Sequence, residues 1–108
     1  MILYGIPTCD TCKKAQKALE AAGHDVSFRD VRATPLSDAE WNELIDEFGD
    51  RLVNRNSTTW RGLNDWMKAS EAEAQLAAYP ALMARPVLRD GDKITLGWDA
   101  KAQAAWGL

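Results

Sequence analysis

The chain has 108 residues, which is the length of one compact domain and too short for two ordinary ones. Hydrophobic residues make up 46% and charged residues 27%, a globular balance that excludes a disordered or coiled-coil chain. Acidic residues outnumber basic ones, 16 to 13, and the resulting net charge of -3 argues against a partner bound through nucleic-acid phosphates.

No apolar run approaches the roughly 18 residues that span a bilayer. The opening segment, residues 1–6, has neither a charged leader nor a long apolar stretch. We therefore expect a cytoplasmic protein without membrane contact. In a reducing compartment, the two cysteines are more often chemical than structural.

The first third of the chain predicts a strand, a helix and a second strand. Residues 1–6 are apolar and end before Pro7, and Val26 and Phe28 alternate with polar residues. Between them, a helix from Asp10 to Ala22 carries one apolar face, and Gly23 ends it. The members of that face are Cys12, Ala15, Leu19 and Ala22. A crossover of this length predicts a parallel strand pair.

The middle of the chain predicts several helices. Ser37 and Glu40 form a capping box, followed by an apolar stripe from Trp41 to Phe48 that stops at Gly49. Residues 50–79 predict shorter helical pieces: Thr58 or Thr59 caps one around Trp60–Trp66, and Ser70 with Glu73 forms a second capping box.

The last third predicts a hairpin and a closing helix. Asp90-Gly91 is a turn signal between Val87-Leu88 and residues 94–96, and the helix runs from Ala100 to Trp106. The whole order predicts an α/β, thioredoxin-like domain (βαβ followed by ββα) over residues 1–108, with a helical insertion at about 36–79.

The most specific chemical motif is the pair Cys9 and Cys12, which lies at the junction between a predicted strand and a predicted helix. The free amides and partial positive charge of a helix N-terminus stabilise a thiolate, and Lys13 and Lys14 add charge there. We expect Cys9 to attack and Cys12, on the apolar face, to resolve. Thr8, Asp10, Thr11 and Lys13 are the expected supporting residues.

Two alternatives exist for this pair. Half of a zinc site is disfavoured because a structural zinc needs four ligands and only His24 remains as a further ligand of the usual kind. The two thiols also fit a packing role as small buried hydrophobes. No metal is expected.

Arg85-Pro86 precedes the third predicted strand. Proline at a strand start cannot donate a ladder hydrogen bond, and it faces the reactive cysteine in thioredoxin-like folds. Arg85 is the expected contact for an anionic substrate, with a solvated arginine as the alternative. The donor-rich stretch of residues 54–61 fits an anion or a carboxylate, or equally a capped connection between helices. The position of His24, just after Gly23, indicates a solvated turn residue.

These motifs resemble the arsenate reductase-like family, the ArsC, Spx and YffB group, over essentially the whole chain. Residues 4–6, 9–15, 85–86 and 96–97 carry the resemblance, and the Thr-Thr-Trp-Arg run at 58–61 is typical of the YffB type. Arsenate reductases of this fold hold the oxyanion with three arginines. Arg85 corresponds to one, Arg55 lies about one residue out of register with a second, and residues 96–98 stand where the third would fall.

The resemblance implies a thiol–disulfide oxidoreductase that uses glutathione as co-substrate and binds no organic cofactor. Cys9 would be the nucleophile, Cys12 its resolving partner, and Arg85, Pro86 and Arg55 the contacts of a small anionic or disulfide substrate. Glutathione or a glutaredoxin-like protein would be the reductant. Two alternatives are a Spx-type redox regulator that binds RNA polymerase and a true arsenate reductase.

Overall fold

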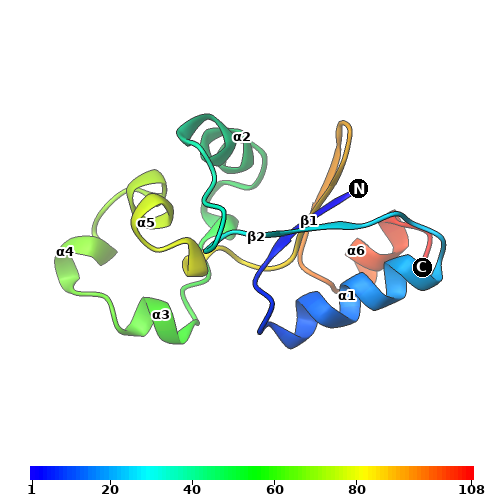
Figure 1. The fold of residues 1–108 in the computed structure, drawn as a ribbon. Coiled ribbons are helices and arrows are strands. Elements are labelled where there is room, and N and C mark those ends of the chain that lie inside the picture. Colours follow the sequence, from blue (N-terminus) through cyan, green and yellow to red (C-terminus); the bar gives the residue numbers. More distant parts are fainter. The chain divides into compact units, whose positions relative to one another are not determined.

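The computed structural model describes all residues, 1–108, and divides into two compact units. The sheet unit comprises Met1–Asp30 and Arg85–Leu108, and the helical unit comprises Val31–Ala84. The fold is the thioredoxin-like α/β class expected from the sequence, with the helical residues inserted between two parts of the sheet unit (Figure 1). No helix is long and apolar enough to cross a membrane.

The sheet unit contains four strands in the order β2-β1-β3-β4. β1 (Ile2–Gly5) pairs parallel with β2 (Ser27–Asp30) and antiparallel with β3 (Val87–Asp90), and β3 pairs antiparallel with β4 (Lys93–Leu96). The hairpin was predicted one residue early: Asp90 pairs with Lys93, so the loop is Gly91-Asp92. Gly91, at φ +61°, supplies the left-handed conformation that a tight hairpin loop needs.

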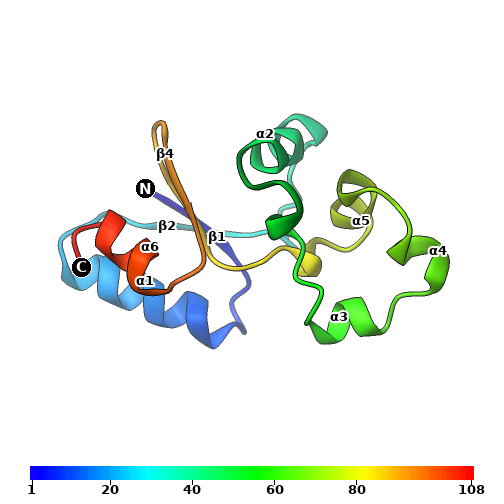
Figure 2. The same cartoon turned by 180° about the vertical axis from the view of Figure 1, so that it is seen from behind.

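Helices α1 (Asp10–Ala21) and α6 (Ala100–Ala105) lie side by side in both views (Figures 1 and 2). Their apolar side chains join those of β1 and β3 in one core, made of Leu3, Cys12, Ala15, Leu19, Leu88 and Trp106. Ala22, expected on this face, is exposed because the helix ends one residue earlier. The core therefore holds the second cysteine of the pair.

His24 is not the solvated turn residue that the sequence predicted. Its ring is half-buried, meets the Trp106 ring edge-on at 87°, and its Nε2 lies 3.1 Å from the Trp106 carbonyl oxygen. The Trp106 indole N–H donates to Thr95 Oγ1 at 2.8 Å, and Lys93 Nζ lies 4.6 Å from the ring centroid. Trp106 thus fastens the end of α6 to the α1–β2 connection and to the hairpin.

The helical unit begins with α2 (Asp38–Phe48), and the predicted capping box of Ser37 and Glu40 is confirmed. The short helix η1 (Gly49–Leu52) follows, and α2 packs on it and on α5 (Ala72–Ala78). Leu52 and Ala84 share a backbone hydrogen bond of 2.7 Å, and Val53 forms a bridge with Met83 just after η2 (Pro80–Leu82). These bonds join the segment that follows η1 to the end of the unit.

Two predictions about α3 are wrong. Ser57, not Thr58 or Thr59, caps α3 (Thr58–Arg61), because its hydroxyl also closes the preceding turn by donating to the Asn54 carbonyl. The helix stops at Gly62 instead of continuing to Trp66, and Asn64 caps a separate helix α4 (Asp65–Lys68).

The predicted capping box of Ser70 and Glu73 is also absent. The Ser70 hydroxyl donates backward to the Trp66 carbonyl, and Glu71 is the N-cap of α5 without a side-chain bond. The buried Gln75 amide completes this connection by donating to the carbonyls of Met67, Lys68 and Ser70.

Two tryptophans of the helical unit form a matched pair for stability measurements. Trp41 is 1% exposed and Trp66 is 83% exposed. We expect Trp41→Ala to lower the free energy of unfolding by about 3–5 kcal/mol, because it opens a cavity in the core. Trp66→Ala should change it by no more than about 0.5 kcal/mol. Urea denaturation measures both, and similar losses in the two variants would contradict the placement of Trp41.

Candidate active site

Cys9 stands at the junction between β1 and α1. Its backbone is extended, and its N–H donates to the Ile6 carbonyl at 3.0 Å, which closes the turn through Pro7 and Thr8. Its own carbonyl accepts from the Lys13 N–H at 3.1 Å, so Cys9 is the N-cap of α1. No side-chain bond caps the helix. The Cys9 sulfur is therefore left beside the free amides of the first helical turn.

The partially exposed Cys9 sulfur accepts hydrogen bonds from the backbone N–H and the thiol of Cys12, and from the Arg85 guanidinium. Burial raises the pKa of Cys9, but these donors and the positive charge of Arg85 outweigh it and hold the pKa below its ordinary value. The lowering does not come from Lys13 and Lys14, as the sequence had suggested; those lysines lie on the exposed face of α1. Cys9 is the better thiolate of the pair.

Cys12 has the opposite environment. It is fully buried, and this burial raises its pKa to about 12, reinforced by the neighbouring Cys9. The Ile6 backbone N–H donates to the Cys12 sulfur and only partly offsets the rise. At neutral pH Cys12 is therefore a protonated thiol that donates toward Cys9.

Gly5 fixes the position of the Cys12 sulfur. A Cβ atom built on Gly5 would lie 2.6 Å from Cys12 Sγ, closer than real Cβ contacts allow. The strand and the helix approach one another at this point because Gly5 has no side chain. The sequence reasoning missed this role, although glycine inside an apolar strand is the usual signal for a close approach of backbone.

Arg85 and Pro86 lie where the chain re-enters the sheet unit, immediately before β3. Arg85 is half-buried and reaches the Cys9 sulfur, so the structure brings together Cys9, Cys12 and Arg85. The Arg85–Pro86 peptide bond is cis. Pro86 is buried, and its carbonyl accepts from the Gly97 N–H at 2.8 Å, which holds it against the end of β4.

The remaining predicted residues do not join this hydrogen-bond network. The predicted supporting residues are all exposed, and none donates to the Cys9 sulfur; they are Thr8, Asp10, Thr11 and Lys13. Arg55 belongs to the helical unit, where its guanidinium lies 5.3 Å from the Trp60 ring centroid and 4.0 Å from an Asp50 carboxylate oxygen. No group of three or more histidine, cysteine or acidic side chains is arranged to hold a metal ion.

A thioredoxin-like fold with a thiol at the N-terminus of its first helix defines a class of redox and thiol-transfer proteins. Residues 4–105 match the model of the ArsC family, and the chain belongs to that arsenate reductase-like family. Within the family it is of the YffB type: a solved structure titled YffB superimposes with a TM-score of 0.86 at 34% identity, covering 96% of both chains.

Two further relatives show the breadth of the group. An uncharacterised protein of Haemophilus influenzae is 36% identical over 108 residues, covering 95% of both chains. The global transcriptional regulator Spx of Listeria innocua is 28% identical over 105 residues, covering 90% of this chain and 79% of Spx. The relatives of this chain therefore include a protein named as a transcriptional regulator.

The contact between Arg85 and the Cys9 sulfur predicts a charge-dependent reactivity. We expect Arg85→Gln to raise the pKa of Cys9, because the thiolate loses a cationic hydrogen-bond donor. The iodoacetamide alkylation rate of Cys9 near pH 7 should then fall, and its inflection should move to higher pH. Intact mass spectrometry follows the reaction, with Arg89→Gln as the control for loss of a positive charge. Superimposable pH profiles would exclude Arg85 as the activating group.

The Gly5 contact predicts a coupled pair of substitutions. Gly5→Ala should destabilise the protein by about 1–3 kcal/mol, because the new methyl group overlaps Cys12 Sγ. Gly5→Ala combined with Cys12→Ala should recover part of this loss, since the sulfur is gone. A double-mutant cycle from urea denaturation measures the coupling, and strictly additive effects would mean that the two groups do not meet.

Proposed function

We propose that this protein is a thiol–disulfide oxidoreductase that uses glutathione as its co-substrate. The single observation that carries the proposal is the partially exposed Cys9 sulfur, which has a lowered pKa and three hydrogen-bond donors from Cys12 and Arg85. A thiolate is the nucleophile of disulfide exchange, and one with a pKa near the ambient pH attacks fastest. The ArsC family assignment supports the same thiol chemistry.

The oxidative half of the proposed cycle starts with glutathione disulfide. The Cys9 thiolate attacks one of its sulfur atoms, a Cys9–glutathione disulfide forms, and one glutathione leaves as a thiolate that takes up a proton. Cys12 then gives up its proton and attacks the Cys9 sulfur, which expels the second glutathione and closes a Cys9–Cys12 disulfide. The protein dithiol is oxidised by two electrons, and glutathione disulfide is reduced to two glutathione molecules.

The attack by Cys9 and the attack by Cys12 differ in rate in this scheme. Cys9 begins with a lowered pKa, whereas Cys12 is buried and has a pKa of about 12. Little Cys12 thiolate is present at neutral pH, so its attack is the slower step in this scheme. The mixed disulfide should consequently persist long enough to be observed, and an external thiol has time to resolve it instead.

Arg85 is proposed as the contact for the anionic part of the substrate. Its guanidinium already lies at the Cys9 sulfur, which is the position from which the substrate is attacked. Pro86, next in sequence and buried, is proposed to border the same substrate. Arg55 is retained as a proposed second anion contact; its side chain, in the helical unit, is 48% exposed.

A redox-responsive regulator is the second candidate function. The observation in its favour is the 28% identity with Spx, a protein named as a global transcriptional regulator. The proposed partner in that case is RNA polymerase, and the Cys9–Cys12 pair would act as the redox switch. Co-purification of the reduced and oxidised protein with RNA polymerase tests this function separately from exchange activity.

Brief exposure to oxidised glutathione distinguishes the roles of the two cysteines. We expect the Cys9→Ser variant to form no adduct, since its remaining thiol is buried and protonated. The Cys12→Ser variant should accumulate one glutathione adduct, and the wild type should pass slowly from the adduct to an internal disulfide. Intact mass spectrometry reads all three masses directly.

Two results would contradict parts of this scheme. Glutathionylation of the Cys9→Ser variant at the wild-type rate would reverse the assignment of nucleophile. A wild-type adduct that never loses glutathione would remove Cys12 from the cycle and leave completion to an external thiol. Turnover of arsenate by the same preparation would instead favour the third candidate, a true arsenate reductase.

A further inference from the structure

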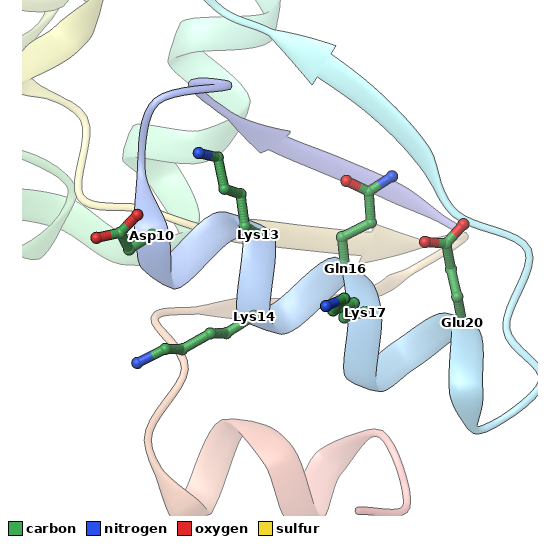
Figure 3. Close-up of a pocket in the computed structure, with 6 residues that line it drawn as sticks. All are labelled: Asp10, Lys13, Lys14, Gln16, Lys17 and Glu20. Atoms are coloured by element: carbon green, nitrogen blue, oxygen red, sulfur yellow. The ribbon is translucent and has the colours of Figure 1, made fainter.

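The exposed side of α1 carries a row of lysines that starts one turn beyond Cys9. Lys13, Lys14 and Lys17, called the lysine face below, line a shallow groove with Gln16. Asp10 closes one end of the groove and Glu20 the other (Figure 3). All three lysines are exposed, and none forms an ion pair within the protein.

Within the lysine face, like charges lie close together on the helix surface. Lys13 and Lys17 are four residues apart and Lys14 and Lys17 are three apart, so their like charges repel along the helix surface and disfavour the helix. The rest of the protein is not cationic, since the net charge of the chain is -3. A group of unpaired positive charges beside the reactive thiol attracts anions from solution.

The distance from Cys9 to the lysine face matches the length of a short extended peptide. With a rise of about 1.5 Å per helical residue, Lys13 and Lys17 lie roughly 6 and 12 Å along the helix axis from Cys9. These separations are close to the Debye length of about 10 Å at 0.1 M salt, so the lysine charges attract an anionic group on a substrate held at Cys9. An extended peptide advances about 3.3 Å per residue, so its second to fourth residues beyond the reacting cysteine span the same interval.

We propose that the lysine face docks the acidic residues of a cysteine-containing peptide while Cys9 attacks the disulfide of that peptide. The inference rests on the proposed function, because it takes Cys9 as the nucleophile, and it adds a substrate class: acidic peptides. Asp10 lies next to Cys9 and repels a carboxylate there, so the acidic residues belong a few positions away from the peptide cysteine.

The reaction used to test this docking is a single disulfide exchange. Two peptides, acetyl-Cys-Gly-Glu-Glu-Glu-amide and acetyl-Cys-Gly-Gln-Gln-Gln-amide, are prepared with their cysteine joined to 2-thiopyridine. The Cys9 thiolate forms a disulfide with the peptide sulfur, the bond to the pyridine sulfur breaks, and pyridine-2-thiolate leaves and takes up a proton. Absorbance of the released 2-thiopyridone gives the second-order rate constant.

The wild type should react roughly tenfold faster with the acidic peptide than with the neutral one at low salt, because electrostatic steering raises association rates by about tenfold or more. Added salt should remove the advantage. The variant Lys14→Gln/Lys17→Gln should lose most of the advantage and keep its rate with the neutral peptide. The control variant Arg51→Gln/Lys101→Gln removes two exposed charges elsewhere and should keep the advantage.

Failure of this inference is distinguishable from failure of the proposed function. Equal rates with the two peptides would overturn docking on the lysine face and leave Cys9 as the nucleophile. Absence of reaction with the neutral peptide would overturn the thiol chemistry. Docking is then decided with an unreactive acetyl-Ser-Gly-Glu-Glu-Glu-amide: NMR shifts of the α1 amides on titration support it, and their absence overturns it.

Discussion

The contact between the Cys12 sulfur and the backbone of Gly5 sets the geometry on which the site depends. Because Gly5 has no side chain, the first turn of α1 approaches β1 closely enough to bury Cys12 completely. Burial of this side chain orients the helix, and the orientation places the Cys12 N–H at the Cys9 sulfur one turn earlier. The reactive end of the helix is therefore positioned by its apolar face, through the same core that contains Leu3, Leu19 and Leu88.

Two identical side chains acquire different chemistry from this placement. Cys9 stands before the helix, partially exposed and surrounded by donors, and its pKa falls. Cys12 points into the core, where a thiolate has lost its hydration, and its pKa rises to about 12. The thiol of Cys12 stays protonated and donates toward Cys9, so the buried cysteine supports the exposed one before any disulfide forms. The position of each cysteine in the fold therefore decides which of the two is the nucleophile.

The sequence was sufficient for the features that depend on local patterns. The strand-to-helix junction at Cys9, the capping box of Ser37 and Glu40, and the β3–β4 hairpin follow from spacing and turn chemistry, and the structure contains all three. The caps of α3 and α5 were assigned wrongly, because several adjacent hydroxyl and acidic residues compete for each position. Only the three-dimensional course of the preceding turn decides between them, as the double use of the Ser57 hydroxyl shows.

Contacts between distant parts of the chain were harder to predict. The Arg85-Pro86 motif before the third strand suggested Arg85 as an anion contact, but its contact with the Cys9 sulfur depends on the return of the chain to the sheet after the helical unit. The pairing of His24 with Trp106 spans 82 positions, and neither residue carries a local signal for it. Closeness in sequence was misleading for the lysines. Lys13 and Lys14 are near Cys9 in the chain, yet Arg85 and Cys12 are the residues that stabilise the Cys9 thiolate.

The burial of one tryptophan in each unit has a spectroscopic consequence. Trp41 lies in the core of the helical unit, and Trp106 lies in the core of the sheet unit with its indole N–H bonded to Thr95. Indole emission shifts to the red when water reaches the ring. Variants that retain only Trp41 or only Trp106 would therefore follow the loss of each core by its own emission. Coincident transitions would show that the two units melt as one cooperative system, and separate transitions would show two.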